Sequence, residues 1–322
     1  MTHFIFTGED VITYNDRISY HYPFKTDFPF SVPAKEFLSF VSASEEDIQL
    51  IKTAEGIINV KSGKAKASFN VVVSNDLGEA LDKIEDSIFD QEAEWLPLPK
   101  DFVNGLALCQ FSVGGDELQN TLTNLYVTGC SVISCDGRRA SFYEMDEEIT
   151  SDYFMIKNKA VKEVAKFKPV AYLLKDNWLH FMDDNQAVLS ARNTEGEYPV
   201  DDVVGLMEKV KGKKFNLPAD DFIKAINVTS IMSESEVAKE KLIRIIFEDK
   251  KITCFGKKAK GESSYEITCD TVLQKDEKME ITLNPDFLKE ILSTSSSVEI
   301  DTEIKKALFT SGSKFQHILP FK

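Results

Sequence analysis

The chain has 322 residues, of which 43% are hydrophobic and 28% charged, a composition typical of a folded, soluble protein. Its net charge of −15 argues against a nucleic-acid-binding protein that relies on summed positive charge. No apolar run approaches the ~20 residues of a membrane-spanning helix, and no basic region followed by an apolar stretch marks a signal peptide. The five cysteines form no CxxC motif, so we expect reduced thiols in a cytoplasmic protein.

A short motif recurs five times along the chain. Each copy has an extended run, then Pro or Asn, then an apolar residue that opens a helical pattern. The anchors are Pro33, Pro99, Asn158, Pro218 and Asn284, so the spacings are 66, 59, 60 and 66 residues. A fixed spacing of this kind indicates a repeated structural unit. We predict a unit of one helix and a meander of short strands.

The predicted elements follow this order along the whole chain. Three strands come first, at 4–6, 11–14 and 18–22. A helix begins near each anchor, because Pro suits the first turn of a helix, where its missing N–H costs nothing. Strands bounded by turn signals follow the helices, at 48–51, 57–61, 64–73, 122–127, 131–135, 140–143, 170–174, 178–182, 187–192, 242–247 and 251–255.

Apolar residues at helical spacing give the predicted helices one buried face. Phe37, Phe40 and Val41 lie on one such face, as do Phe102, Leu106 and Cys109, and core packing is their simplest role.

The N-terminal strands look like a sixth copy whose helix is missing. Six half-units, taken in pairs, predict an α+β protein of three alike domains at 1–92, 93–213 and 214–322. The acidic stretch 77–90 and the lysine-rich run 209–214 are the expected connectors.

Five short motifs occur in the order found in one protein family. They are Gln110-Phe111-Ser112, the strand and turn Val132-Ile133-Ser134-Cys135-Asp136-Gly137-Arg138-Arg139, Glu195-Gly196-Glu197-Tyr198-Pro199, Ile281-Thr282-Leu283-Asn284 followed by Phe287-Leu288, and the tail Ile318-Leu319-Pro320-Phe321-Lys322. Together with the repeat, these motifs resemble those of the bacterial sliding clamp, the beta subunit of DNA polymerase III. The chain looks like a divergent member, of a kind that phages could encode, with a shortened first domain.

The resemblance implies a head-to-tail homodimeric ring of clamp domains around double-stranded DNA, with helices inside and sheets outside. Such a ring is a processivity factor in DNA replication: it tethers the replicative DNA polymerase by topology, is placed on DNA by a clamp loader, and contacts phosphates without reading sequence. It needs no catalysis, cofactor or metal.

The resemblance also implies a pocket for partner peptides, which suits peptides with Leu and Phe anchors. Its expected lining is Leu122, Gly137, Arg139, Ala140, Pro199, Val203, Val204, Asn284, Phe287, Leu319, Pro320 and Phe321. Core packing between adjacent domains is the alternative role, especially for Leu122 and Val204. Near Pro199 the family often has basic residues, whereas this chain has Asp201 and Asp202.

Two further surfaces are expected. The DNA-facing candidates are the lysines of the helix at Asn158, with one lysine from each other helix: Lys157, Lys159, Lys162, Lys166, Lys35, Lys100, Lys224 and Lys289. A solvated lysine face is the alternative. By family resemblance the dimer interface includes Phe69, Val71, Ile231 and Met232.

Nothing in the sequence favours an enzyme. The chain has no GxxxxGK[ST], HExxH or GxSxG motif, and its four histidines are scattered over different repeats. Cys130 and Cys135 have no second pair to complete a zinc site. Two alternatives to a clamp stay open: a platform that binds clamp-binding motifs without encircling DNA, and a repeat scaffold with no nucleic-acid role.

Overall fold

The computed structural model describes residues 3–15, 17–44, 46–53, 56–70, 82, 84–90, 92–115, 121–233, 241–259, 261–269, 273 and 277–322. The chain is α+β, as predicted, and divides into two compact units. The first comprises Met1–Val103 and Lys159–Thr194, and the second comprises Asn104–Asn158 and Glu195–Lys322. In the part of the chain that the structure describes, every helix is too short or too polar to cross a membrane.

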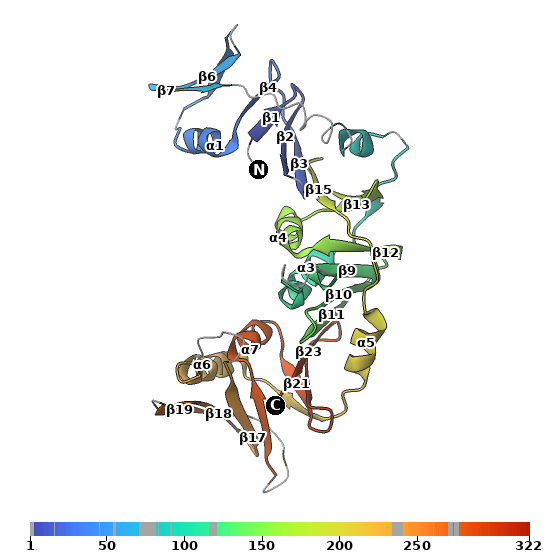
Figure 1. Cartoon of the computed structure of the whole chain (residues 1–322), viewed down its shortest axis with the longest axis vertical. Helices are drawn as coiled ribbons and strands as arrows, with labels where there is room; N and C mark the ends of the chain where they lie inside the picture. The colour runs from blue at the N-terminus through green and yellow to red at the C-terminus, as the bar shows by residue number, and fades with distance from the viewer. Residues whose placement is uncertain are drawn as a thin grey trace. The chain divides into compact units, whose positions relative to one another are not determined.

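The first unit is built on an antiparallel sheet of eight strands (Figure 1). Their order is β4 (Phe30–Pro33), β1 (His3–Phe6), β2 (Asp10–Asn15), β3 (Ile18–Pro23), β15 (Val188–Arg192), β14 (Trp178–Met182), β13 (Ala171–Lys175) and β8 (Leu96–Pro97). The N-terminal strands join the later ones where β3 pairs with β15, with His21 opposite Val188.

A smaller sheet completes the first unit. It contains β5 (Gln49–Lys52), β6 (Ile57–Ser62) and β7 (Ala65–Asn70). Helix α1 (Ala34–Ser42) begins directly after Pro33, and its Phe37 packs in a cluster with Phe6, Phe30 and Ile58. This is the core role predicted for the apolar face of that helix.

The second unit repeats the eight-stranded design. The order is β12 (Thr150–Lys157), β9 (Asn124–Gly129), β10 (Ser131–Cys135), β11 (Ala140–Glu144), β23 (Phe315–Pro320), β22 (Lys306–Ser311), β21 (Ser297–Asp301) and β16 (Lys213–Asn216). The two halves join where β11 pairs with β23, with Ala140 opposite Ile318.

The second unit also holds a sheet of four strands: β19 (Gly261–Thr268), β18 (Lys251–Lys258), β17 (Ile243–Glu248) and β20 (Met279–Leu283). Helix α6 (Ala219–Ser230) covers this sheet, and α7 (Pro285–Leu292) lies beside α6 (Figure 1). Phe222, Ile245, Leu288 and Phe309 are among the residues of the core that these elements share.

The predicted repeat is visible in the order of the elements. A strand, a helix and three strands follow one another five times, with the helices α1, α3 (Phe102–Cys109), α4 (Asn158–Phe167), α6 and α7. Among the described residues before Ala34 there are strands only. The strand before each helix becomes the fourth strand of another three-stranded meander. For example, β4 pairs with β1, and β12 pairs with β9. The β5–β7 sheet has three strands in the described part of the chain.

Some elements differ from the prediction. Helix α5 (Val200–Glu208) was not predicted, although Val203 and Met207 lie one turn apart and are both buried. Lys213 and Lys214 belong to β16 and not to a connector. Strand β7 ends at Asn70, and 71–73 lie outside the described residues. The three-domain boundaries stay a prediction.

Candidate peptide-docking site

A cavity of about 180 Å3 lies beside the β11–β23 junction of the second unit. Three segments supply its walls: the turn between β10 and β11, the start of α5, and the neighbouring strands β22 and β23. Its lining residues are Cys135, Gly137, Arg138, Arg139, Ala140, Pro199, Asp202, Val203, Leu206, Lys306, Ile318 and Pro320. An apolar slot with a few polar groups at its rim is suited to a peptide side chain.

The β10–β11 turn is held by the carboxylate of Asp136. Its Oδ1 atom accepts backbone hydrogen bonds from Arg138 and Arg139, each 2.9 Å long. Gly137 has φ +80°, a backbone conformation that glycine adopts without steric cost. A Cβ at this glycine would lie 4.0 Å from Cδ1 of Leu122, so Leu122 stands next to the turn. The Asp-Gly pair is therefore a structural requirement of the cavity wall.

Arg139 connects this wall to α7. Its side chain is only 9% exposed, and Nε donates to Asp136 Oδ2 at 3.1 Å. Its Nη1 donates to Glu290 Oε2 at 2.7 Å. The guanidinium also lies 4.0 Å from the centroid of the Phe287 ring. Two carboxylates and an aromatic face thus hold one buried guanidinium, which is the kind of fixed geometry that lysine cannot reproduce.

Asn284 orients α7 for these contacts. Its side-chain oxygen accepts the backbone N–H of Asp286 at 2.8 Å and of Phe287 at 3.4 Å, and Pro285 occupies the first helical position. This is a helix N-cap. Asn284 and Phe287 are absent from the cavity lining, and Phe287 reaches the cavity through Arg139.

Helix α5 forms the opposite wall. Pro199 precedes its first turn, and Asp201 and Asp202 lie in that turn, where negative charge suits the helix dipole. Val203 is buried and lines the cavity, whereas Val204 packs against the neighbouring apolar cluster. Asp202 at the rim gives this wall a negative charge.

The C-terminal tail is divided between the cavity and the core. It forms β23, so alternate side chains face opposite sides of the sheet. Ile318 and Pro320 line the cavity. Leu319 and Phe321 point to the other side, where they are 2% and 9% exposed in the core of the second unit. The tail is docked along its whole length.

A buried histidine, one of the four scattered along the sequence, lies on the same strand, and no role was predicted for it. His317 is fully buried, with Nδ1 2.8 Å from Ser141 Oγ and 3.2 Å from Ser112 Oγ. Burial lowers its pKa well below the ordinary value, with a smaller contribution from the nearby Arg139 charge. The Gln-Phe-Ser motif that contains Ser112 thus helps to fix β23 beside the cavity.

Of the twelve residues predicted for this site, the structure brings six together around the cavity: Gly137, Arg139, Ala140, Pro199, Val203 and Pro320. Six lining residues were not predicted: Cys135, Arg138, Asp202, Leu206, Lys306 and Ile318. Three of these, Arg138, Asp202 and Ile318, are sequence neighbours of a predicted residue. The helical spacing of α5 and the alternation along β23 are the signals that could have found Leu206 and Ile318.

The lysines predicted to face DNA lie on five helices or beside them. On α4, Ala160, Val161 and Val164 are buried, whereas Lys159, Lys162 and Lys166 are exposed. Lys157 ends β12 and is exposed. Lys35, Lys100 and Lys224 are exposed, and Lys289 is half-buried in the last turn of α7. Lys166 and Lys224 each pair with an acid one turn away, at 3.6 and 3.0 Å.

The residues predicted for a dimer interface lie near two sheet edges. Phe69 is on β7, half-buried against Phe37. Ile231 follows α6 and is 61% exposed, and the Met232 side chain lies close to Gly261 at the start of β19. Val71 lies outside the described residues.

No cluster of three or more His, Cys, Asp and Glu side chains in the described part of the chain could hold a metal ion.

The fold was compared with known proteins. No protein-family model matches the sequence, and no curated protein matches it. Among solved structures, a DNA polymerase sliding clamp from Pseudomonas aeruginosa is similar with a TM-score of 0.81 and 14% identity, over 100% of this chain and 91% of that one. A Caulobacter crescentus sliding clamp has a TM-score of 0.78 and 15% identity, over 100% and 90%. A Helicobacter pylori beta clamp, in complex with 3,4-difluorobenzamide, has a TM-score of 0.78 and 13% identity, over 100% and 91%.

The resemblance read from the five motifs is therefore confirmed at the level of the whole fold. The chain has the fold of the bacterial DNA polymerase III beta subunits, the sliding clamps.

Proposed function

We propose that this protein is a sliding clamp: two copies close into a ring around duplex DNA and hold a replicative DNA polymerase, in the cytoplasm, during synthesis. A clamp loader places the ring on DNA. The fold supports this function, and a ring that acts by topology needs no catalytic residue.

The observation that carries the proposal is the arrangement of sheet edges. In each unit, one eight-stranded sheet joins two groups of four strands through a single pairing, β3 with β15 and β11 with β23. The remaining sheets are bounded by β5 and β7 and by β19 and β20, so β7 and β19 each have one strand neighbour among the described residues. Pairing β7 of one protomer with β19 of the other makes a third junction of the same kind and leaves neither edge open.

The two edges carry opposite charges. Lys64 and Lys66 are exposed at β7, and Glu262 and Glu266 are exposed on β19. Complementary charge favours pairing of unlike edges and disfavours pairing of like ones. The exposed Ile231, beside β19, supplies apolar surface for the same contact.

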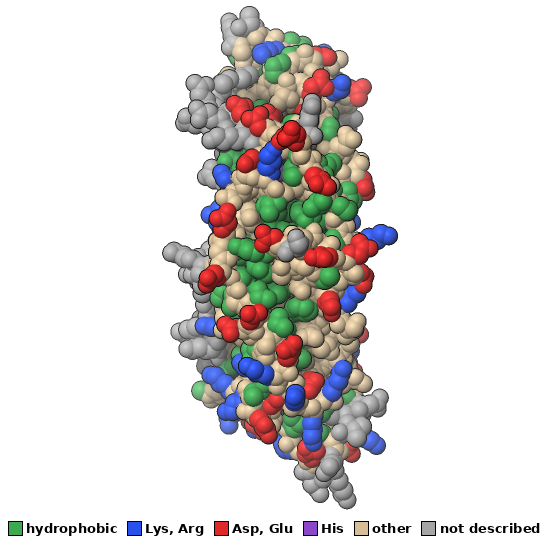
Figure 2. Space-filling model, turned by 90° about the vertical axis from the view of Figure 1, so that its right-hand side faces the viewer, with side chains coloured by type: hydrophobic (Ala, Val, Ile, Leu, Met, Phe, Trp, Pro, Cys, Tyr) green, Lys and Arg blue, Asp and Glu red, His purple; other side chains and the backbone are tan. Residues whose placement is uncertain are grey.

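The distribution of charge is compatible with DNA in the ring. Acidic side chains are spread over the face drawn in Figure 2, whereas α4 exposes Lys159, Lys162 and Lys166. A few lysines give weak, sequence-independent phosphate contacts, which is what a sliding protein needs.

The cavity at Arg139 is the proposed docking site for polymerase and clamp-loader peptides. Its apolar lining suits a Leu or Phe anchor, and Arg138, Lys306 and Asp202 at its rim offer groups for the peptide backbone and flanking charges.

A first experiment measures the mass and shape of the full chain in solution by light scattering and small-angle X-ray scattering. The ring predicts a particle of about twice 36.3 kDa with a central hole. The Ile231→Asp variant should be monomeric. The matched control Ile304→Asp, at an exposed isoleucine of the β21–β22 turn, should stay dimeric.

A second experiment tests encirclement. The protein is loaded on nicked circular DNA and isolated, and the circle is then cut once. A ring stays on the circle and is lost from the linear DNA, whereas a protein held by charge alone dissociates equally from both.

A platform that binds clamp-binding peptides without encircling DNA is the second candidate, and the net charge of −15 favours it. A monomer that still binds peptide at the Arg139 cavity would establish this function and exclude the ring.

A further inference from the structure

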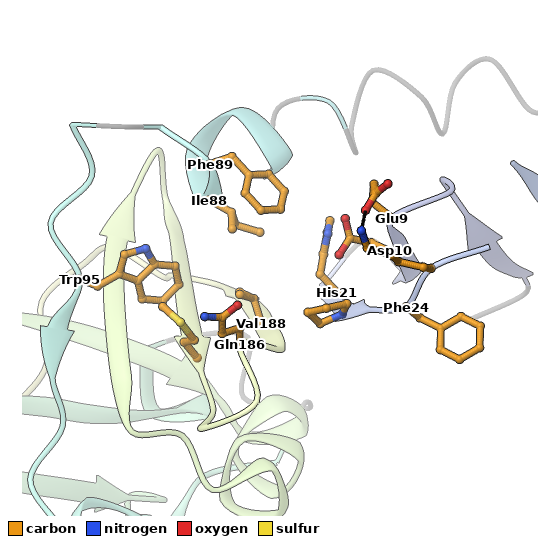
Figure 3. A pocket seen from close by; sticks show the side chains of 12 residues that line it. Glu9, Asp10, His21, Phe24, Ile88, Phe89, Trp95, Gln186 and Val188 are labelled. Atoms are coloured by element: carbon orange, nitrogen blue, oxygen red, sulfur yellow. Dashed lines mark ion pairs between the residues drawn. The ribbon is translucent and has the colours of Figure 1, made fainter. Parts of the chain in front are cut away.

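A second cavity, of about 580 Å3, lies in the first unit. Its floor is a row of three side chains across neighbouring strands, His21 on β3, Val188 on β15 and Met182 on β14, which lie opposite one another in the sheet. Residues 84–88 are helical, and Ile88, Phe89 and Trp95 from this part of the chain form the other side (Figure 3). The cavity is larger than the one at Arg139 and within the range of ligand-binding pockets.

The cavity exposes aromatic surface that core packing does not use. Phe89 is 61% exposed and Phe24 is 49% exposed, and both line the cavity. Ile88, Trp95 and Met182 extend this apolar surface into the interior. Aromatic side chains grouped at a concave surface are typical of binding sites.

His21 is an unused polar group on the floor. The residue is 2% exposed, and neither Nδ1 nor Nε2 has a hydrogen-bond partner among the residues that the structure describes. Burial lowers its pKa to about 4, so the imidazole is neutral at pH 7 and has one donor and one acceptor. Buried polar groups are normally paired, and one that lines a cavity can be paired by a ligand.

The rim of the cavity is acidic. Glu9 and Asp10 lie at the start of β2, and Glu9 pairs with Lys25 at 3.2 Å (Figure 3). Burial raises the pKa of Asp10, and the nearby Glu9 charge raises it further. Burial also raises the pKa of Glu85, with further contributions from the charges of Asp82 and Asp10. Among the lining residues, Glu9 and Asp10 stand against the single Lys25, so the rim carries a net negative charge and a basic ligand is favoured.

The cavity also shares its construction with the candidate docking site. Both lie beside the pairing that joins the two halves of an eight-stranded sheet, and in both a helical segment packs over the joined strands, α5 in one case and residues 84–88 in the other. The fold thus provides the same kind of recess twice, with different linings.

We propose that this second cavity docks a short basic peptide. A Leu or Phe side chain of the peptide enters between Phe89, Trp95 and Met182, its backbone pairs with His21, and flanking Lys or Arg residues meet Asp10. The site does not depend on ring closure and is separate from the Arg139 cavity, so it gives the protein a second class of partner.

The two tryptophans of the chain report on this site. Trp95 lines the cavity, and Trp178 lies in the apolar cluster beneath the helical segment. The probe is the hexapeptide RKLFKR, titrated into the full-length protein at pH 7 while tryptophan fluorescence is recorded. The matched acidic peptide EDLFDE contains the same apolar anchor. We expect a saturable change with RKLFKR, at least tenfold weaker binding of EDLFDE, and loss of most of the signal in Trp95→Phe.

Variants identify the contacts. Phe89→Ala and His21→Leu should each weaken RKLFKR binding at least tenfold, and His21→Leu should leave the melting temperature unchanged or raise it. The control Leu174→Ala removes another exposed side chain of the first unit, 42% exposed on β13, and should bind normally. Arg139→Ala should also bind normally, which separates this site from the proposed docking site.

Three results would overturn the proposal. The first is no saturable signal up to millimolar peptide, and the second is equal affinity of RKLFKR for the wild type and both cavity variants. The third is a change in Trp95 fluorescence with protein concentration alone that persists in the Ile231→Asp variant, which would show that a second copy of the chain occupies the cavity.

Discussion

The guanidinium carbon of Arg139 lies 4.0 Å from the centroid of the Phe287 ring, and this contact joins the β10–β11 turn to α7. The same guanidinium donates to Asp136 in its own turn and to Glu290 on α7. One side chain therefore fixes the shape of the candidate docking cavity from two directions. The cavity depends on this geometry as well as on the positive charge.

Replacing Arg139 by lysine should separate these two contributions. Lysine keeps the charge but lacks the planar fork that meets two carboxylates and a ring at once. We expect the affinity for a clamp-binding peptide with Leu and Phe anchors to fall about tenfold, about 1.4 kcal/mol, as measured by fluorescence anisotropy. Arg244 stacks on Phe255 at 4.6 Å and pairs with Glu280, so Arg244→Lys is a matched control that should bind normally. Equal losses in the two variants would contradict the assignment.

We predict that substitutions at two adjacent residues of β23, Leu319 and Pro320, affect different properties: stability in one case and peptide binding in the other. Leu319 is 2% exposed in the core, so Leu319→Ala should lower the free energy of unfolding by about 2–5 kcal/mol. Pro320 lines the cavity and is exposed, so Pro320→Ala should weaken peptide binding with little change in stability. Denaturant unfolding and peptide titration on both variants test this. A stability loss in Pro320→Ala as large as in Leu319→Ala would contradict the division of the strand.

The proposed pairing of β7 with β19 can be tested by exchanging charges. Lys64→Glu with Lys66→Glu should weaken the dimer, because four acids would then face one another across the edges. Glu262→Lys with Glu266→Lys should weaken it in the same way. The quadruple variant restores opposite charges and should recover most of the lost affinity, measured by sedimentation. A quadruple variant weaker than either double variant would exclude this pairing.

The lysines of α4 should control the salt dependence of DNA binding. Each phosphate contact contributes about 0.9 to the slope of log affinity against log salt concentration. Changing Lys159, Lys162 and Lys166 to alanine should therefore flatten the slope by up to about 2.7 and shorten the products of processive synthesis. The control removes the same charge at Lys209, Lys211 and Lys214, which are exposed near β16. An unchanged slope in the α4 variant would show that these lysines are only solvated.

The sequence predicted the repeat well because local signals define it. Pro33, Pro218 and Asn284 each stand directly before a helix, and turns such as Asp176-Asn177, both with positive φ, end the strands where expected. These signals act within a few residues, so they can be read without knowledge of the fold.

The candidate site was predicted less completely because tertiary pairing creates it. The side of β23 that faces the cavity is set by its register with β11, Ala140 opposite Ile318, and no local pattern gives that register. The family resemblance placed Leu319 and Phe321 in the pocket, but the structure places them in the core. The unpaired His21 was missed for the same reason, because its surroundings come from β15 and residues 84–88.

Because of its buried histidines, we predict that the protein begins to lose stability near pH 6.5, above the pH range in which carboxylates ordinarily titrate. Burial lowers the pKa of His21 and of His180 to about 4, so both are neutral in the folded state, whereas in the unfolded chain they protonate near pH 6.5. The unfolded state therefore binds more protons between these values, and the free energy of unfolding falls as the pH drops from 6.5 to 4. For His21 alone the loss at pH 4 is about 3 kcal/mol.

Urea unfolding between pH 7 and 4.5 measures this dependence. His21→Leu should make the curve of unfolding free energy against pH shallower by up to one proton, since that site no longer titrates. Tyr22→Leu changes the next residue of β3, which is 38% exposed, and should leave the slope as in the wild type. Parallel curves for the wild type and His21→Leu would show that the pKa of His21 is the same in the folded and unfolded states. Water or a neighbouring group would then have to pair its ring nitrogens.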